Sequence, residues 1–246
     1  MLKPENNPTC KKIAFFSDEF LLQGILHLPA ADRPPVVIGS HGLFSSSSSP
    51  KQVALAQKCI ENGIAFFRFD HRGCGQSQGD FKKVTSLESR CVDLISAVKT
   101  IRSRTDTGDR LGLFGSSMGG AVCIYAANLL DVKALVTVAA PVRSSSVVEA
   151  LNKSKNPDSL LQPFDLKYLR SDISDKLAGL HHILIFHGQA DHVVPPSNAQ
   201  EIYSKAAWPK KLIMQKDGDH PMSKKEHQEN FVKEAVNWYK ACFEES

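Results

Sequence analysis

A serine between glycines at residues 115–119 is the strongest chemical signal in the sequence. This segment, GSSMG, matches the pattern G-x-S-x-G. It follows the apolar run 111–115 and precedes a helical pattern starting at Met118, so the serine falls on a strand-to-helix turn. A helix N-terminus favours negative charge that develops beside it. The pattern predicts Ser117 as a nucleophile; the alternative is a glycine-rich turn with an idle serine.

A serine hydroxyl needs a base to take its proton, and His220 is the histidine best placed to serve. It lies in the segment DGDHP, after the last predicted strand and before the last predicted helix. His27 lies at the wrong end of the chain, and His227 lies within a helical pattern. His181 and His182 precede a strand and therefore fall at the opposite edge of the sheet. His220 is the predicted general base.

A carboxylate should orient that histidine and stabilise the imidazolium, and Asp191 is the predicted acid. It is the first acidic residue after the apolar run 183–187. Asp217 and Asp219 are rivals, but both are so close to His220 in sequence that a geometry facing its Nδ1 is harder to build.

Backbone N–H groups are the expected stabilisers of a tetrahedral intermediate. The N–H of Met118 follows the nucleophile directly, and the second donor should come from the loop after the run 36–40. The N–H of Leu43 is the best candidate there, because Gly42 permits a close approach of the backbone. His41 is interpreted as a structural residue that bonds nearby loop backbone, in preference to a direct catalytic role.

Eight short apolar runs alternate with helical patterns and must position these residues. Most of the runs are continuous, which is typical of strands covered on both faces. The alternation predicts a doubly wound, mostly parallel sheet with right-handed crossovers. The expected strands are 12–17, 22–27, 36–40, 64–70, 111–115, 134–139, 183–187 and 211–216, and the expected helices are 50–62, 86–103, 118–130, 197–207 and 224–243.

One interval, 142–181, lacks a convincing strand and contains two prolines, Pro157 and Pro163. Forty residues without structure are unusual inside a domain, so this interval is predicted to form a small helical cap on a single domain spanning 1–246. Its apolar residues either line a substrate pocket or pack the cap onto the sheet, and the sequence favours neither. They are Val147, Val148, Leu151, Leu160, Leu161, Phe164, Tyr168 and Leu169.

Composition narrows the classes of partner and location. The net charge is +4, and the 30 basic residues are spread among 26 acidic ones, so neither a nucleic-acid nor a membrane partner is expected. The N-terminus lacks the layout of a signal peptide, and no run approaches about 18 apolar residues. The six cysteines form no C-x-x-C pair, and no H-E-x-x-H is present. We expect a cytoplasmic protein without a metal site.

Together these segments resemble the α/β-hydrolase superfamily over nearly the whole chain, from about residue 12 to 243. The likeness is carried by the H-G pair at 41–42, the serine turn at 115–119, HGQADHVVP at 187–195, DGDH at 217–220 and D-x-R-G-x-G-x-S at 70–77. The chain order serine, aspartate, histidine is typical of this fold. The resemblance implies an eight-stranded, mostly parallel sheet with a short cap inserted after the sixth strand.

The segment 70–77 is expected to be mainly structural in such proteins. Its glycines permit a tight loop, and Arg72 and Ser77 are expected to tie the loop down. Cys74 is interpreted as a packing residue and not as a nucleophile.

Within the superfamily, the chain is most similar to small microbial carboxylesterases of the feruloyl- or cinnamoyl-esterase type and to serine-aminopeptidase-like hydrolases. It resembles dienelactone hydrolases in size but has Ser117 where they use cysteine. The resemblance implies hydrolysis of a small-molecule ester with a small or medium acyl group, aromatic ones included, through an acyl-enzyme and without a cofactor. The alternatives are a peptidase, amidase or acyltransferase with the same three residues, or a ligand-binding protein that keeps the fold without catalysis.

Overall fold

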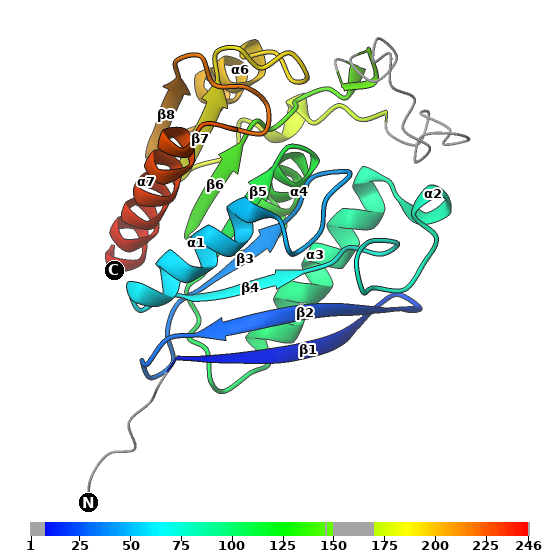
Figure 1. The fold of residues 1–246 in the computed structure, drawn as a ribbon, viewed down its shortest axis with the longest axis vertical. Coiled ribbons are helices and arrows are strands. Elements are labelled where there is room, and N and C mark those ends of the chain that lie inside the picture. Colours follow the sequence, from blue (N-terminus) through cyan, green and yellow to red (C-terminus); the bar gives the residue numbers. More distant parts are fainter. Residues whose placement is uncertain (1–7, 146, 150–169, 246) are drawn as a thin grey trace, which may run out of the picture.

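Eight strands form one sheet in the order β1-β2-β4-β3-β5-β6-β7-β8 (Figure 1). The computed structural model describes residues 8–145, 147–149 and 170–245. The strands are β1 (Thr9–Ser17), β2 (Phe20–Leu28), β3 (Val36–Ser40), β4 (Ala65–Phe69), β5 (Leu111–Ser116), β6 (Ala134–Val138), β7 (Ile183–Gly188) and β8 (Lys210–Gln215). The helices are α1 (Pro50–Glu61), α2 (Phe81–Val84), α3 (Leu87–Arg102), α4 (Met118–Ala127), α6 (Ser197–Lys205) and α7 (Lys225–Glu244), with a 3-10 turn η2 (Ser174–Lys176).

Strands β3 to β8 are all parallel to one another. At one side of the sheet β2 pairs antiparallel with β4 and β1 pairs antiparallel with β2, so β2 alone runs against the other strands. Every residue of β3, β6 and β7 is buried. Strands covered on both faces have no solvent side, and this explains why the sequence shows continuous apolar runs there instead of alternation. The predicted doubly wound, mostly parallel sheet is confirmed.

Helices cover both faces of the sheet (Figure 1), and two apolar layers of side chains hold them against it. Leu94 of α3 and Val122 of α4 belong to the layer on one face, which also includes Ile202 of α6. Leu55 of α1 and Tyr239 of α7 belong to the layer on the other face. The order of the strands and the position of the helices therefore bring the carboxyl ends of β3, β5, β7 and β8 to the same edge of the sheet.

Within the described residues the predicted strands and α-helices agree with the observed ones to within a few residues, except that one short α-helix was not predicted. The sequence patterns missed α2, which has only four residues and therefore no measurable periodicity. Its start is marked by Asp80, whose side chain accepts the N–H of Lys82. Helix α4 ends earlier than expected, because Asn128 caps it and donates to the carbonyls of Ile124 and Lys176.

The expected cap at 142–181 lies partly outside the described residues, which omit 146 and 150–169. The two described flanks meet at an isolated bridge between Arg143 and Asp172. The cap and the single-domain boundary remain predictions. Within the described ranges, no helix combines the length and apolar character that crossing a membrane requires.

Candidate active site

Ser117 lies at the sharp turn between β5 and α4, in a strained backbone conformation with φ 53° and ψ −125°. Such a conformation costs a non-glycine residue about 1–3 kcal/mol, so its surroundings must enforce it. The Ser117 N–H donates to the carbonyl of Val138 at 2.8 Å, and the Ser117 carbonyl accepts from the N–H of Gly120 at 2.7 Å. A Cβ atom on Gly119 would collide with the backbone carbonyl of Ser40. The turn therefore depends on glycine at a position where two backbone segments touch.

His220 lies on the loop between β8 and α7 and connects Ser117 to Asp191. Its Nε2 lies 3.0 Å from Ser117 Oγ, and its Nδ1 lies 2.8 Å from Asp191 Oδ2. An ionised carboxylate only accepts hydrogen bonds, so Nδ1 carries the proton of the neutral ring. The Nε2 lone pair then faces the serine hydroxyl, which is the arrangement a general base requires.

Asp191, on the loop after β7, is held by backbone donors and by a second histidine. Its Oδ1 accepts the N–H groups of Val193 and Val194 at 2.9 and 2.8 Å. His187 Nε2 donates to the Val194 carbonyl at 2.8 Å and also lies 3.4 Å from Asp191 Oδ2. Burial alone would raise the pKa of Asp191, but the hydrogen bonds from His187, His220 and the backbone hold that pKa below its usual range. The carboxylate therefore stays ionised beside His220.

The rival acids take other positions. Asp219 accepts two hydrogen bonds from Ser223, from the backbone N–H at 2.7 Å and from the hydroxyl at 2.6 Å. Asp217 is exposed and has φ 56°. The structure thus brings Ser117, Asp191 and His220 together and turns the Asp219 carboxylate toward Ser223.

The loop after β3 runs beside the serine. A Cβ on Gly42 would stand 3.6 Å from Ser117 Cβ, so this backbone segment is in near contact with the turn that carries Ser117. The side chain of Leu43 packs against Met118. His41 is fully buried; it accepts the backbone N–H of His71 on Nε2 at 3.2 Å and donates from Nδ1 to the Gly42 carbonyl at 2.8 Å. Both ring nitrogens of His41 bond loop backbone.

An apolar wall lies next to Leu43, and from the sequence only its member Val148 was expected to line a pocket or pack the cap. It comprises Leu43, Phe44, Phe81, Met118 and Val148. The rings of Phe44 and Phe81 lie 5.7 Å apart, and Phe44 is 46% exposed. Phe44 lies just after the H-G pair, and Phe81 lies just after the D-x-R-G-x-G-x-S loop. The position of these two aromatic residues beside the motifs is the sequence feature that could have predicted the wall. The wall gives the serine an apolar neighbour on the side of the β3 loop.

The D-x-R-G-x-G-x-S segment forms a loop tied to its surroundings by its polar side chains. Asp70 accepts the N–H of Ser47 at 2.6 Å and of Gln76 at 2.9 Å, and Ser77 donates to the Asp70 carbonyl at 2.6 Å. Burial raises the pKa of the Cys74 thiol, so this side chain stays neutral.

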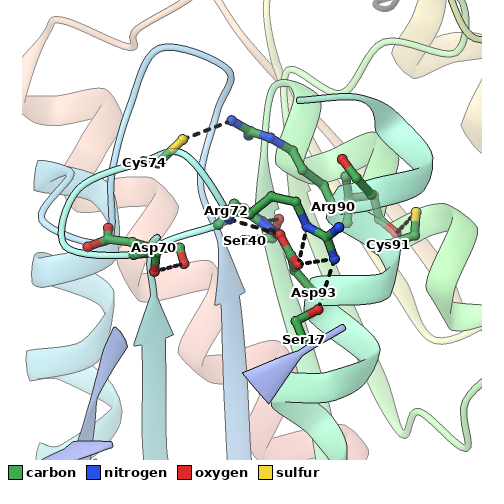
Figure 2. A network of polar contacts seen from close by, with 12 residues as sticks. Ser17, Ser40, Asp70, Arg72, Cys74, Arg90, Cys91 and Asp93 are labelled. Carbon is green, nitrogen blue, oxygen red and sulfur yellow. Dashed lines mark hydrogen bonds and ion pairs between the residues drawn. The ribbon is translucent and has the colours of Figure 1, made fainter. Parts of the chain in front are cut away.

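Arg72 anchors the same loop to α3 and β1. Its guanidinium donates to Asp93 at 2.8 Å, to Ser17 at 3.1 Å and to Asp18 at 2.9 Å, and Figure 2 shows the contacts with Asp93 and Ser17. Asp93 also accepts the backbone N–H of Arg72 at 3.0 Å. These contacts are structural and lie apart from Ser117. Across the described ranges, no cluster of three His, Cys, Asp or Glu side chains gathers to hold a metal ion.

This strained serine on a doubly wound sheet, contacted by a histidine that a buried aspartate orients, defines the chain as a member of the α/β-hydrolase superfamily. The family described as "Serine aminopeptidase, S33" matches residues 32–164, more than half of the chain. The chain therefore belongs to this family of hydrolases, and the expected resemblance is confirmed.

Individual proteins of known sequence or structure are similar to this chain. The protein named "Uncharacterized protein YfhR" of Escherichia coli (strain K12) is 30% identical over 193 residues, covering 78% of this chain and 65% of the relative. The match thus spans just under two thirds of that relative's length. The mitochondrial palmitoyl-protein thioesterase ABHD10 of Mus musculus is 26% identical over 220 residues, and the match covers 78% of this chain and 71% of that relative. The structure of Est1E from Butyrivibrio proteoclasticus with bound ferulic acid superposes with a TM-score of 0.77 at 19% identity, covering 94% of this chain and 99% of that one.

Proposed function

We propose that this protein is a serine esterase, with Ser117 as nucleophile, His220 as general base and Asp191 as the acid that orients the histidine. The observation that carries the proposal is the continuous hydrogen-bonded chain from Asp191 through His220 to Ser117, with distances of 2.8 and 3.0 Å. The tautomer dictated by Asp191 leaves His220 able to take a proton only from the side of Ser117.

The reaction proceeds in two halves. Ser117 Oγ attacks the ester carbonyl while His220 Nε2 takes its proton, and the carbonyl oxygen becomes an oxyanion that the N–H groups of Leu43 and Met118 bind. The carbonyl re-forms, the C–O bond to the alcohol breaks, and His220 returns the proton to the leaving alcohol. Water then attacks the acyl-enzyme with His220 as base, which releases the acid and regenerates Ser117.

The apolar wall supports an acyl group of small or medium size as the substrate. Phe44 and Phe81 present aromatic surface beside the loop that carries Leu43. Aromatic side chains pair well with aromatic and aliphatic groups, so aryl and short alkyl esters both suit this surface. Thioesters are a second candidate, since a relative 26% identical to this chain is named a palmitoyl-protein thioesterase and a thioester carbonyl is open to the same attack.

Hydrolysis of p-nitrophenyl esters from acetate to palmitate tests the proposal, with Ser117→Ala as the control. We expect turnover that is highest for short or medium chains and is lost in Ser117→Ala. The same acyl groups presented as thioesters and as aminoacyl amides then rank the thioesterase and peptidase alternatives. A fluorophosphonate should label the protein and spare Ser117→Ala. Turnover that survives Ser117→Ala would refute the assignment, and labelling of Ser117 without turnover of any ester, thioester or amide would favour a non-catalytic binding protein.

A further inference from the structure

Arg90, on α3, is a fully buried cation that bonds the backbone of the β3 loop. Its guanidinium donates to three successive carbonyls: His41 at 3.2 Å, Gly42 at 3.2 Å and Leu43 at 3.0 Å. It also donates to Cys74 Sγ at 3.4 Å (Figure 2). Within the part of the chain that the structure describes, no carboxylate forms an ion pair with Arg90, and its Nε has no hydrogen-bond partner.

Burying the Arg90 guanidinium without a carboxylate partner costs free energy of folding, so we ask what this arrangement contributes to the protein. A buried charge normally has a carboxylate partner, and neutral carbonyls compensate its lost hydration only in part. Burial lowers the pKa of Arg90, and the nearby Cys74 and Asp93 offset only part of that effect. The other buried arginine of this region, Arg72, does have such a partner in Asp93. Apart from the Cys74 thiol, the hydrogen-bond partners of Arg90 are the backbone carbonyls of the β3 loop.

The geometry of the peptide bond links Arg90 to the active site. In a planar trans peptide the C=O and the following N–H point in opposite directions. A Gly42 carbonyl held by Arg90 therefore sends the Leu43 N–H away from the guanidinium. His41 Nδ1 donates to the same Gly42 carbonyl at 2.8 Å, so this peptide is fixed from two sides.

The charge of Arg90 adds a second effect. Hydrogen bonds in a chain polarise one another, and a cation on the carbonyl of a peptide makes its N–H a stronger donor. The Gly42–Leu43 peptide receives its hydrogen bonds on the oxygen and has its N–H free to bind an oxyanion.

We propose that Arg90 is a positioning residue for the oxyanion hole, which acts through the Gly42–Leu43 peptide to aim and polarise the Leu43 N–H. The proposal rests on the esterase function proposed above. It makes Arg90 important for transition-state binding and unimportant for binding the neutral ester, because the oxyanion exists only after Ser117 attacks.

The variants Arg90→Lys and Arg90→Met test this, with Arg72→Lys as the matched control in the same buried region. Loss of one oxyanion donor costs about 100- to 1000-fold in kcat, so misaiming one should lower kcat by roughly 10- to 100-fold while KM stays within about threefold. Affinity for phenylboronic acid, which forms a tetrahedral adduct on the serine, should weaken by a similar factor. Arg72→Lys should lower the melting temperature and keep kcat within about threefold, because Arg72 does not contact the loop.

The measurements are kcat and KM on p-nitrophenyl acetate, boronate inhibition, and thermal unfolding to show the folded fraction. Unchanged kcat and boronate affinity in both Arg90 variants, with Ser117-dependent turnover in the parent, would overturn this inference and leave the esterase proposal intact. Equal losses in kcat for Arg90→Lys and Arg72→Lys, or loss of the folding transition in both Arg90 variants, would assign Arg90 to stability alone. Absence of Ser117-dependent turnover and labelling in the parent would overturn both proposals.

Discussion

Replacement of Asp191 by asparagine should nearly abolish turnover, because the surrounding donors dictate which way the new amide turns. Asp191 Oδ1 accepts two backbone N–H groups, from Val193 and Val194, at 2.9 and 2.8 Å. Oδ2 faces His220 Nδ1 at 2.8 Å, with His187 farther away at 3.4 Å. An NH2 group at the Oδ1 position would face two close N–H donors, which is unfavourable. The asparagine should therefore place its oxygen at the Oδ1 position and its NH2 group toward His220.

That orientation reverses the tautomer of His220. An NH2 group donates, so Nδ1 must become the acceptor and the ring proton moves to Nε2. An Nε2 that carries a proton cannot accept one from Ser117. A wrong tautomer of this kind costs about 10⁴-fold in kcat, which corresponds to about 5 kcal/mol in the activation barrier.

The assay is kcat on p-nitrophenyl acetate, together with the 15N resonances of the His220 ring, which distinguish the two tautomers. Asp219→Asn is the matched control, since its carboxylate bonds Ser223 and not the histidine. We expect Asp219→Asn to retain most activity and Asp191→Asn to show an Nε2–H ring. Asp191→Asn with more than about a tenth of parental kcat, or Asp219→Asn as the more damaging change, would refute the tautomer argument.

Three further outcomes follow from the packing and protonation of the described residues. Gly119→Ala should destabilise the fold by about 1–3 kcal/mol in urea unfolding, because its Cβ meets the Ser40 carbonyl, whereas Gly42→Ala, with only ordinary contacts at 3.5–3.6 Å, should leave stability unchanged. Burial lowers the pKa of His71 to about 4, so below about pH 6.5 the unfolded chain binds a proton that the folded chain does not bind. The free energy of unfolding should therefore fall by up to about 3 kcal/mol as the pH drops from about 6.5 to 4. A free energy of unfolding that stays constant over that pH range in urea unfolding would contradict this. Iodoacetamide should label the native protein at Cys10, the exposed cysteine among six, and Cys10→Ser should remove that labelling, as mass spectrometry of the intact protein can check.

The sheet and the three loops of the candidate site were accessible from the sequence because their signals are local. Continuous apolar runs mark buried strands, and parallel strands place their following loops at one edge of the sheet. Ser117, Asp191 and His220 each lie a few residues after such a run, so their meeting could be predicted without knowledge of side-chain contacts. The sequence favoured Asp191 over Asp219 because Asp219 is adjacent to His220, and the structure adds that Asp191 Oδ2 lies 2.8 Å from His220 Nδ1 whereas the Asp219 carboxylate bonds Ser223.

Arg90 shows what local patterns miss. The apolar residues of its helix predict a buried stripe, and a charged residue near such a stripe is ordinarily assigned to the solvated face. Arg90 follows Leu87 by three residues and therefore lies on the buried stripe. A charge at that position indicates a partner from outside the helix, but the sequence does not show that the partner is backbone carbonyl groups at His41–Leu43.

Three buried charged side chains near the carboxyl ends of the strands, those of Asp70, Arg90 and Asp191, form hydrogen bonds to backbone groups of the loops. Asp191 accepts two N–H groups of its own loop, Asp70 accepts N–H groups from two loop segments, and Arg90 donates to three carbonyls. Loop backbone lacks the partners that helices and strands provide, and a buried peptide group left unpaired is costly. In the loops that surround Ser117, these charged side chains therefore supply the hydrogen bonds that a helix or strand would otherwise provide to the backbone. Truncating any one of these side chains to alanine frees several peptide groups at once, so such changes should disturb the shape of the site before they disturb the sheet.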